Sequence, residues 1–290
     1  MIMKNIAQRL LVFFIGLPAL FAIALLLPHY HHLAFNLIVV TVSGLGATEF
    51  SGMLSNKKMS IPKKEAAVFG VLPPLAMILV VGFGADVLLI PAVFAAVAVW
   101  LLLSRTFSSG GALEDFIYRF AAGLAVLIYP GMLMAWIVGI SQREKGAGII
   151  ILTFLFMVFS GDGLAWALGM AFGKNNKGLI PASPNKSIAG FIGAILAPIG
   201  TGIGAALIWP DIFVPKCASF LGSPVAAGFI AGLLTGIAAI LGDLGESAIK
   251  RSSGIKDSGS IIPGRGGVLD SIDSLAIAAP VFYLVFSMLF

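Results

Sequence analysis

The sequence predicts an all-α membrane protein, a polytopic bundle of about nine transmembrane helices. Hydrophobic residues make up 59% of the chain and charged residues only 11%, whereas a soluble protein carries about 25% charged residues. Apolar runs of about 18 residues or more recur along the whole length, and each can cross a bilayer as a helix. No stretch predicts a soluble domain, so residues 1–290 are expected to form a single integral-membrane domain. The only cysteine, Cys217, excludes an internal disulfide and a cysteine-based metal cluster.

The apolar runs, and the Gly, Pro and polar residues that separate them, set the expected boundaries of the elements. The expected helices are 9–27, 33–54, 66–83, 86–103, 119–140, 147–170, 188–209, 225–249 and 274–290. Five of them lie in residues 1–140. The other four lie in residues 147–290, which also contain two polar loops, at 171–187 and 250–273.

The first helix has the charge pattern of a signal peptide, because Lys4 and Arg9 precede an apolar run that ends at Leu27. That run is longer than the apolar region of a signal peptide, and Pro28-His29-Tyr30 offers no small-residue cleavage site. We therefore expect a retained transmembrane helix.

The distribution of positive charge predicts the orientation. With nine crossings, 15 of the 18 Lys and Arg residues fall on the side of the N-terminus, and only Arg143, Lys145 and Lys216 fall on the other side. The positive-inside rule then places the N-terminus in the cytoplasm and the C-terminus outside. The same rule explains the basic net charge of +5, so no nucleic-acid partner is expected; such binding needs a basic, solvent-exposed domain.

Several closely spaced glycines, Gly190 with Gly193 and Gly200 with Gly202 and Gly204, invite comparison with a nucleotide-binding loop. A dinucleotide fingerprint needs a preceding strand, whereas these glycines lie inside apolar helices. We expect them to allow close helix packing.

Three acidic residues, Glu49, Asp162 and Asp243, lie within predicted transmembrane helices. Ionisable residues at such positions are costly and often functional. Each lies late in an even-numbered helix, so the predicted topology puts all three near the cytoplasm, where they would line a polar cavity. The alternative is that each merely reaches to the interface. An ion-coupled transporter could use the same residues, but no internal repeat typical of transporters is evident.

The polar segment 242–273 carries nine charged side chains in an otherwise apolar chain. Asp243, Glu246 and Lys250 follow the spacing i, i+3, i+7 and so share one face of a continuing helix. Asp270 and Asp273 are three residues apart as the ninth helix begins. Because Mg²⁺ prefers a few carboxylates together with substrate phosphates, Asp243, Asp270 and Asp273 are candidate metal ligands. The alternative is a salt-bridged loop with an Asp helix cap.

Two loop elements are candidate phosphate-binding groups. In the turn 263–267, the backbone amides of Gly266 and Gly267 can approach phosphate oxygens, and Arg265 can add a bidentate contact. In the earlier loop, Lys186 and Ser187 precede the seventh helix, where an anion site is plausible. The alternative for the earlier loop is an ordinary helix cap with positive-inside lysines.

These residues resemble the signature of the CDP-diacylglycerol synthases (phosphatidate cytidylyltransferases). The matching residues are Gly242, Asp243, Leu244, Glu246, Ser247, Lys250, Arg251, Lys256, Asp257, Gly259, Ile262, Pro263, Gly266, Gly267, Asp270 and Asp273, together with Gly173, Lys174, Ser183, Pro184, Lys186, Ser187 and Gly190. The resemblance is clear in the C-terminal half of the chain, with its gaps in register.

The resemblance implies the reaction of CTP with phosphatidate to give CDP-diacylglycerol and pyrophosphate, with Mg²⁺ as cofactor and a monovalent cation such as K⁺ as an option. It further implies a homodimer in membrane lipid, in a bacterial inner membrane. The catalytic residues would be Asp243, Lys250, Asp270 and Asp273, with Asp243, Asp270 and Asp273 as metal ligands. The expected substrate-binding residues are Ser183, Lys186, Ser187, Arg251, Lys256, Arg265, Gly266, Gly267 and Asp162.

Three positions depart from the family pattern. Arg265 stands where the family has histidine, Ser271 where it has arginine, and Ala189 where it has glutamate. The metal-binding carboxylates and Lys250 are intact. The alternative reading is therefore a divergent paralogue that uses another lipid phosphate or nucleotide, or one that has lost activity.

Overall fold

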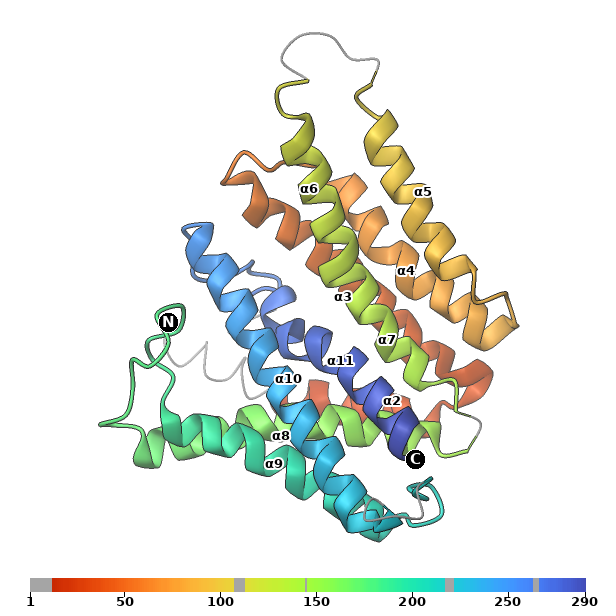
Figure 1. Ribbon diagram of the computed structural model, residues 1–290, viewed down its shortest axis with the longest axis vertical. Coiled ribbons are helices and arrows are strands. Elements are labelled where there is room, and N and C mark those ends of the chain that lie inside the picture. The colour runs from red at the N-terminus through yellow and green to blue at the C-terminus, as the bar shows by residue number, and fades with distance from the viewer. Residues whose placement is uncertain (1–11, 107–112, 144, 217–221, 263–265) are drawn as a thin grey trace. The chain divides into compact units, whose positions relative to one another are not determined.

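The computed structural model describes residues 12–106, 113–143, 145–216, 222–262 and 266–290 (Figure 1). The regular elements in these residues are helices, and the only β pairing among them is two isolated bridges. The elements are η1 (Val12–Gly16), α2 (Leu17–Leu26), α3 (His29–Ser55), α4 (Lys63–Phe83), α5 (Leu89–Leu103), α6 (Phe116–Val126), η3 (Leu127–Met132), α7 (Leu133–Ile140), α8 (Ala147–Phe172), α9 (Ile188–Ile208), α10 (Pro224–Ser252) and α11 (Leu269–Leu289). The predicted all-α class is confirmed.

Each of the nine predicted spans corresponds to a helical segment, with α6, η3 and α7 forming one continuous span. Among the described residues, seven segments are long and apolar enough to cross a membrane. They are α3, α4, the span Phe116–Ile140, and α8 to α11. The remaining two, Phe14–Leu26 and Leu89–Leu103, are shorter apolar helices. The protein is thus a polytopic helical membrane protein, and a total of nine crossings stays a prediction.

The chain divides into two compact units. Unit 1 consists of Met1–Gln142 and Lys250–Ile272, and unit 2 consists of Arg143–Ile249 and Asp273–Phe290. Helices α10 and α11 each pass from one unit to the other. The polar segment after Ile249 therefore belongs to the N-terminal helices, although it follows the C-terminal helices in sequence.

Unit 1 is built around α3 and α4, which run side by side, with α6, η3 and α7 packed against them (Figure 1). Pro74 lies inside α4 and cannot donate to the carbonyl of Gly70. The buried Ser43 hydroxyl of α3 lies 2.7 Å from that carbonyl and also contacts the carbonyl of Pro130 in η3. The Ser43 hydroxyl thus lies between the carbonyls of Gly70 and Pro130, beside the prolines of two neighbouring helices.

The connection between the first two helices differs from the expected linker 28–32. Helix α3 begins at His29, and Tyr30, His31 and His32 all have positive φ values of 49–58°. Non-glycine residues seldom adopt this left-handed conformation, so the chain is kinked here. His32, the last residue of the kinked segment, is buried.

Unit 2 contains α8 and α9 packed along each other, with α10 against α9 (Figure 1). A Cβ atom at Gly193 would lie 2.6 Å from the carbonyl oxygen of Leu164, and one at Gly202 would collide with the backbone of Gly228. The predicted packing role is confirmed for Gly190, Gly193 and Gly202. A Cβ at Gly200 or Gly204 would meet nothing within 4 Å, so these two glycines are not close packing contacts among the described residues.

The last two helices are longer than predicted, which shortens the loop 250–273. Helix α10 continues to Ser252, and α11 begins at Leu269 instead of residue 274. The early start of α11 has a physical cause, since Val268, Leu269 and Ile272 are apolar and buried. Both Asp270 and Asp273 therefore lie in the first turns of α11.

Candidate functional site

Asp270 accepts three hydrogen bonds, which orient its carboxylate. Its Oδ2 atom accepts hydrogen bonds from the backbone N–H of Gly267 at 2.7 Å and of Ser258 at 2.9 Å. Its Oδ1 atom faces the Lys250 ammonium at 2.7 Å. All these donors stabilise the charged form of the carboxyl group, so Asp270 is held as an oriented anion at the start of α11.

The ion pair between Lys250 and Asp270 is largely shielded from solvent, with side chains 14% and 7% exposed. Lys250 comes from the last turn of α10, where a cation is favoured by the negative end of the helix dipole. Asp270 comes from the first turn of α11, where an anion is favoured. The two helix ends thus bring together a cation and an anion, and removing one partner would leave a buried charge uncompensated.

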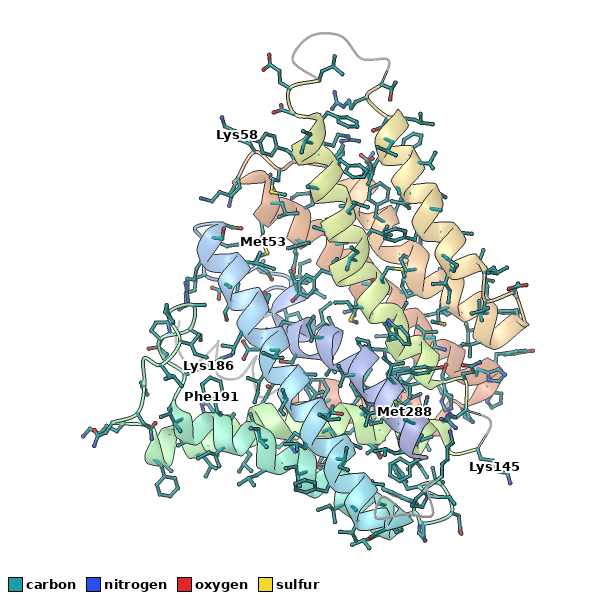
Figure 2. The ribbon with its side chains drawn as sticks, in the orientation of Figure 1. Met53, Lys58, Lys145, Lys186, Phe191 and Met288 are labelled. Carbon is teal, nitrogen blue, oxygen red and sulfur yellow. The ribbon has the colours of Figure 1, made fainter. Side chains whose placement is uncertain are left out.

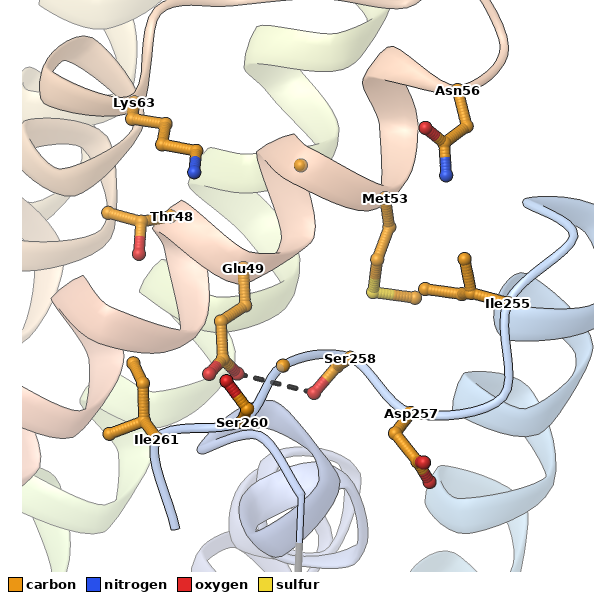
Figure 3. Close-up of a pocket in the computed structure, with 12 residues that line it drawn as sticks. Thr48, Glu49, Met53, Asn56, Lys63, Ile255, Asp257, Ser258, Ser260 and Ile261 are labelled. Atoms are coloured by element: carbon orange, nitrogen blue, oxygen red, sulfur yellow. Dashed lines mark hydrogen bonds between the residues drawn. The ribbon is translucent and has the colours of Figure 1, made fainter.

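Glu49 of α3 joins this arrangement from a distant part of the sequence. Its Oε2 atom accepts a hydrogen bond from the backbone N–H of Leu269 at 2.9 Å and from the Ser258 hydroxyl at 3.2 Å (Figure 3). The carboxylate is buried, with 9% of the residue exposed. Leu269 is the first residue of α11, so Glu49 provides an acceptor for one of the N–H groups that a helix leaves unpaired at its start.

Three glycines pack directly against these carboxylates. A Cβ at Gly259 would collide with Oε1 of Glu49, and a Cβ at Gly267 would lie 2.5 Å from Oε2. Gly266 has φ +115°, a conformation that favours glycine, and a Cβ there would lie 2.7 Å from Oδ2 of Asp270. The glycines predicted to offer backbone amides are therefore needed here for space, and Gly267 does donate its amide, to Asp270.

A pocket of about 370 Å³ adjoins the same loop. Figure 3 shows it between α3 and the segment 255–261, with the amine of Lys63 and the amide of Asn56 directed toward it. Its lining is mixed, with Glu49 and Asp257 as acids and with apolar groups such as Met53. This volume lies in the range of small-molecule sites.

Unit 2 contains a second lysine–carboxylate pair. Lys186 lies in the loop before α9 (Figure 2) and its ammonium contacts Oδ2 of Asp243 on α10. Ser187 is the N-cap residue of α9, and its hydroxyl accepts a hydrogen bond from the N–H of Gly190 at 3.1 Å. The loop itself is fixed by backbone hydrogen bonds, including Ile188 N–H to the carbonyl of Asn176 at 3.1 Å. Ser187 thus forms the helix cap that the alternative interpretation expected, and Lys186 is directed to a carboxylate, while the anion site stays a prediction.

Asp273 and Asp243 belong to the same unit and approach through a glycine. A Cβ at Gly242 would lie 2.5 Å from the carbonyl oxygen of Asp273, so α10 and α11 can touch only because residue 242 has no side chain. Asp273 is buried, and its Oδ1 atom accepts from the N–H of Ser274 at 2.6 Å. Within unit 2, Lys186 is thus paired with Asp243, and the backbone of Asp273 lies against the neighbouring Gly242.

The remaining predicted residues lie as follows. Arg251 and Lys256 are exposed, Asp162 is exposed in the middle of α8, and Ser183 is half-buried in the loop before α9. Arg265 lies outside the described residues. Of the departures, Ser271 is half-buried on α11, where its hydroxyl lies 3.4 Å from the carbonyl of Gly267, and Ala189 is half-buried in the first turn of α9.

The proposed magnesium ligands fit the metal in their donor chemistry, because Mg²⁺ prefers carboxylate oxygens. Asp270 belongs to unit 1, whereas Asp243 and Asp273 belong to unit 2. In the part of the chain that the structure describes, no three His, Cys, Asp or Glu side chains gather around one point. A lysine ammonium instead compensates the charge of Asp243 and of Asp270. The three-carboxylate metal site stays a prediction, as does a site for K⁺.

Sequence reasoning did not assign Glu49 and Ser258 to the site. Glu49 was noticed as a carboxylate inside a predicted helix, but its partners, Leu269 and Ser258, are 220 and 209 residues away. Ser258 lies between two matching motif positions, Asp257 and Gly259, which was the available signal. Both residues contact Asp270 or the residue that precedes it.

A match to a family model shows to which protein family the chain belongs. The model of the cytidylyltransferase family matches residues 7–289. The chain belongs to the cytidylyltransferase family. The match includes both units, so the N-terminal helices, for which the sequence offered only helix number and topology, are part of the relationship.

Individual relatives of this cytidylyltransferase-family chain cover less of it. A phosphatidate cytidylyltransferase of Haemophilus influenzae is 42% identical over 139 residues, 47% of this chain and 45% of that protein. A phosphatidate cytidylyltransferase of Thermotoga maritima is 34% identical over 170 residues, 58% of this chain and 60% of that protein. An uncharacterised protein of Escherichia coli, YnbB, is 34% identical over 151 residues, 51% of this chain and 46% of that protein. The matched part of the chain spans about half the length of these curated relatives.

Proposed function

We propose that this protein transfers the cytidylyl group of CTP to phosphatidate, giving CDP-diacylglycerol and pyrophosphate. The observation that carries the proposal is the Lys250–Asp270 pair, a shielded cation beside an anion oriented by two backbone amides. The family match and the relatives named phosphatidate cytidylyltransferase support it. Lys186, held by Asp243 before α9, supplies a second cation of the kind that phosphate recognition requires.

In the proposed reaction, a phosphate oxygen of phosphatidate attacks the α-phosphorus of CTP in line. The new O–P bond forms as the bond between the α-phosphorus and the bridging oxygen breaks, and pyrophosphate leaves with that electron pair. The attacking phosphate monoester is already anionic near neutral pH, so a strong general base is unnecessary. The protein's contribution is therefore to position two anions and to offset their charge.

The residues have distinct roles in this scheme. Lys250 and Lys186 are the cations that would exchange a carboxylate for a substrate phosphate oxygen. Asp243, Asp270 and Asp273 would hold Mg²⁺, which neutralises phosphate charge when it is bound. Arg251, Lys256 and Arg265 would draw the nucleotide toward the loop by their positive charge.

The predicted topology places CTP and these residues on the cytoplasmic side of a bacterial inner membrane. Phosphatidate would enter sideways from the lipid, with its phosphate meeting the nucleotide at the depth of the headgroups. A homodimer within the membrane is part of the proposal. Asp162, exposed on α8, stays a candidate substrate-binding residue.

The second candidate is a paralogue with a different acceptor or nucleotide. The departures at Ala189, Arg265 and Ser271 favour it, because Ala189 and Ser271 each lack a charged side chain that the family pattern has. The catalytic chemistry would be the same, since Lys250, Asp243, Asp270 and Asp273 are intact.

A panel assay separates the two candidates. Purified protein in mixed micelles is supplied with CTP, dCTP, UTP or ATP and with phosphatidate or another lipid phosphate, and lipid-linked nucleotide is measured. We expect CTP with phosphatidate to give the highest rate. A higher rate with another acceptor would favour the paralogue, and no nucleotide transfer in any combination would contradict the proposed function.

A further inference from the structure

Glu49 is a buried acid that the proposed reaction does not use directly. It lies in α3, more than 200 residues from the motif, yet its Oε2 atom accepts from both Leu269 N–H and the Ser258 hydroxyl. Its Oε1 atom is buried and has no hydrogen-bond partner in the described residues. A purely stabilising role does not explain this acid, because a buried polar atom without a hydrogen bond lowers the free energy of unfolding.

Ser258 connects Glu49 to Asp270. The Ser258 hydroxyl donates to Glu49 at 3.2 Å and accepts from the backbone N–H of Asp270 at 3.3 Å. The backbone N–H of the same serine donates to Oδ2 of Asp270 at 2.9 Å. A displacement of Ser258 would therefore move a donor and an acceptor of Asp270 together.

The start of α11 provides a second connection. The carboxylate of Glu49 accepts from Leu269, the first residue of the helix and the one directly before Asp270. An anion at this end of a helix is stabilised by the unpaired N–H groups and the helix dipole. Glu49 therefore fixes the point at which α11 begins, and with it the direction in which Asp270 leaves the backbone.

Two glycines leave the space that the Glu49 carboxylate occupies. A Cβ at Gly259 would collide with Oε1, and a Cβ at Gly267 would lie 2.5 Å from Oε2. Figure 3 shows the carboxylate directed from α3 onto the segment that contains Ser258 and Ser260. The side chain thus fills a space that these glycines leave open.

We propose that Glu49 is a positioning residue, which holds Asp270 in its reactive orientation through Ser258 and the first turn of α11. Removal of the carboxylate would leave Lys250, Asp270 and the nucleotide-binding cations in the chain but would let Asp270 rotate. The loss would then appear in kcat, with little change in the KM for CTP. This inference rests on the proposed function for its kinetic consequence and on the hydrogen bonds alone for its structural consequence.

The test compares Glu49→Ala and Glu49→Gln with a control, Glu65→Gln. Glu65 is a second shielded acid of unit 1. It lies on α4 and forms an ion pair with Arg119 of α6 at 2.6 Å. We expect Glu49→Ala to lower kcat about 10- to 100-fold, the usual effect of removing a partner of this kind. Glu49→Gln keeps an oxygen acceptor for Leu269 and Ser258 and is expected to restore kcat to within about threefold of wild type.

The control distinguishes positioning from stability. Glu65→Gln is expected to lower the melting temperature in detergent while leaving kcat unchanged. An equal loss of kcat in Glu65→Gln and Glu49→Ala would overturn the proposal, as would a Glu49→Ala protein with wild-type kcat or a Glu49→Gln protein as slow as Glu49→Ala.

Hydrogen exchange tests the same inference without turnover. In Glu49→Ala, the amides of residues 266–272 are expected to exchange at least about tenfold faster than in wild type, whereas those of α8 and α9 do not change. Unchanged exchange in residues 266–272 would overturn the proposal. If the wild type transfers no nucleotide, the proposed function fails, and the exchange measurement still decides whether Glu49 holds the start of α11.

Discussion

Replacing Asp270 by asparagine changes one acceptor into a donor without changing the shape of the side chain. In the structure, Oδ1 accepts from the Lys250 ammonium and Oδ2 accepts from the N–H groups of Ser258 and Gly267. An asparagine has only one acceptor oxygen. Its NH₂ group must therefore face either an ammonium or two backbone donors.

The less costly orientation of the asparagine amide determines how much the free energy of unfolding is expected to fall. With the oxygen toward the two backbone donors, the protein loses one charge-assisted hydrogen bond, worth about 1.5–3 kcal/mol. With the oxygen toward Lys250, two shielded N–H groups lose their acceptor, at about 1–3 kcal/mol each. We therefore expect Asp270→Asn to lower the free energy of unfolding by about 1.5–3 kcal/mol. The same loss of orientation would lower kcat at least about tenfold.

The assay combines unfolding in mixed micelles with CTP turnover, and it includes the double variant Asp270→Asn with Lys250→Met. Removing the ammonium relieves its repulsion with the new NH₂ group, so the double variant should be less destabilised than the sum of the two single variants. Activity should stay low in the double variant, because neither the carboxylate nor the cation has returned.

A matched control is Asp86→Asn, the same chemical change at an exposed aspartate that accepts one hydrogen bond, from Leu88 N–H at 2.8 Å. The asparagine oxygen can accept that single bond, so the free energy of unfolding should not change measurably. Wild-type stability in Asp270→Asn, or strictly additive losses in the double variant, would refute the described bonding of Asp270.

Three further predictions concern other parts of the site. Ser187→Ala removes the cap of α9 and should lower the free energy of unfolding by about 1 kcal/mol in mixed-micelle unfolding; no loss would contradict the cap. Gly267→Ala, which places a Cβ 2.5 Å from Glu49 Oε2, should cost about 1–3 kcal/mol by overpacking, whereas Gly204→Ala, with nothing within 4 Å, should cost nothing in the same experiment. Chelation of divalent ions should abolish CTP turnover and added Mg²⁺ should restore it, and full turnover in excess chelator would contradict the metal requirement.

The fold was predictable because each helix carries its own apolar run. The ends of α10 and α11 were not, since they depend on contacts that a local pattern does not contain. At the start of α11, Leu269 is buried and its N–H group donates to Glu49, 220 residues earlier. The polar composition of the segment alone suggested a longer loop.

The site was predictable where its chemistry is concentrated in sequence. Lys250 and Asp270 were identified from spacing and family resemblance, and the structure pairs them. Their supporting groups could not be found in the same way, because Glu49 belongs to the third element of the chain and Ser258 has no distinguishing chemistry of its own. Gly266 and Gly267 were predicted to offer amides to phosphate. The structure adds that Gly267, like Gly259, must lack a side chain, because a Cβ there would collide with Glu49.

The central claim is that the protein transfers the cytidylyl group through the site that contains Asp270. The most direct measurement uses CTP labelled at either the α- or the γ-phosphorus, with phosphatidate and with purified wild type or Asp270→Ala. We expect α-label in lipid and γ-label in pyrophosphate in equal amounts with wild type, and at least about 100-fold less of both with Asp270→Ala. Label transferred by Asp270→Ala at the wild-type rate, or γ-label found in lipid, would contradict the account.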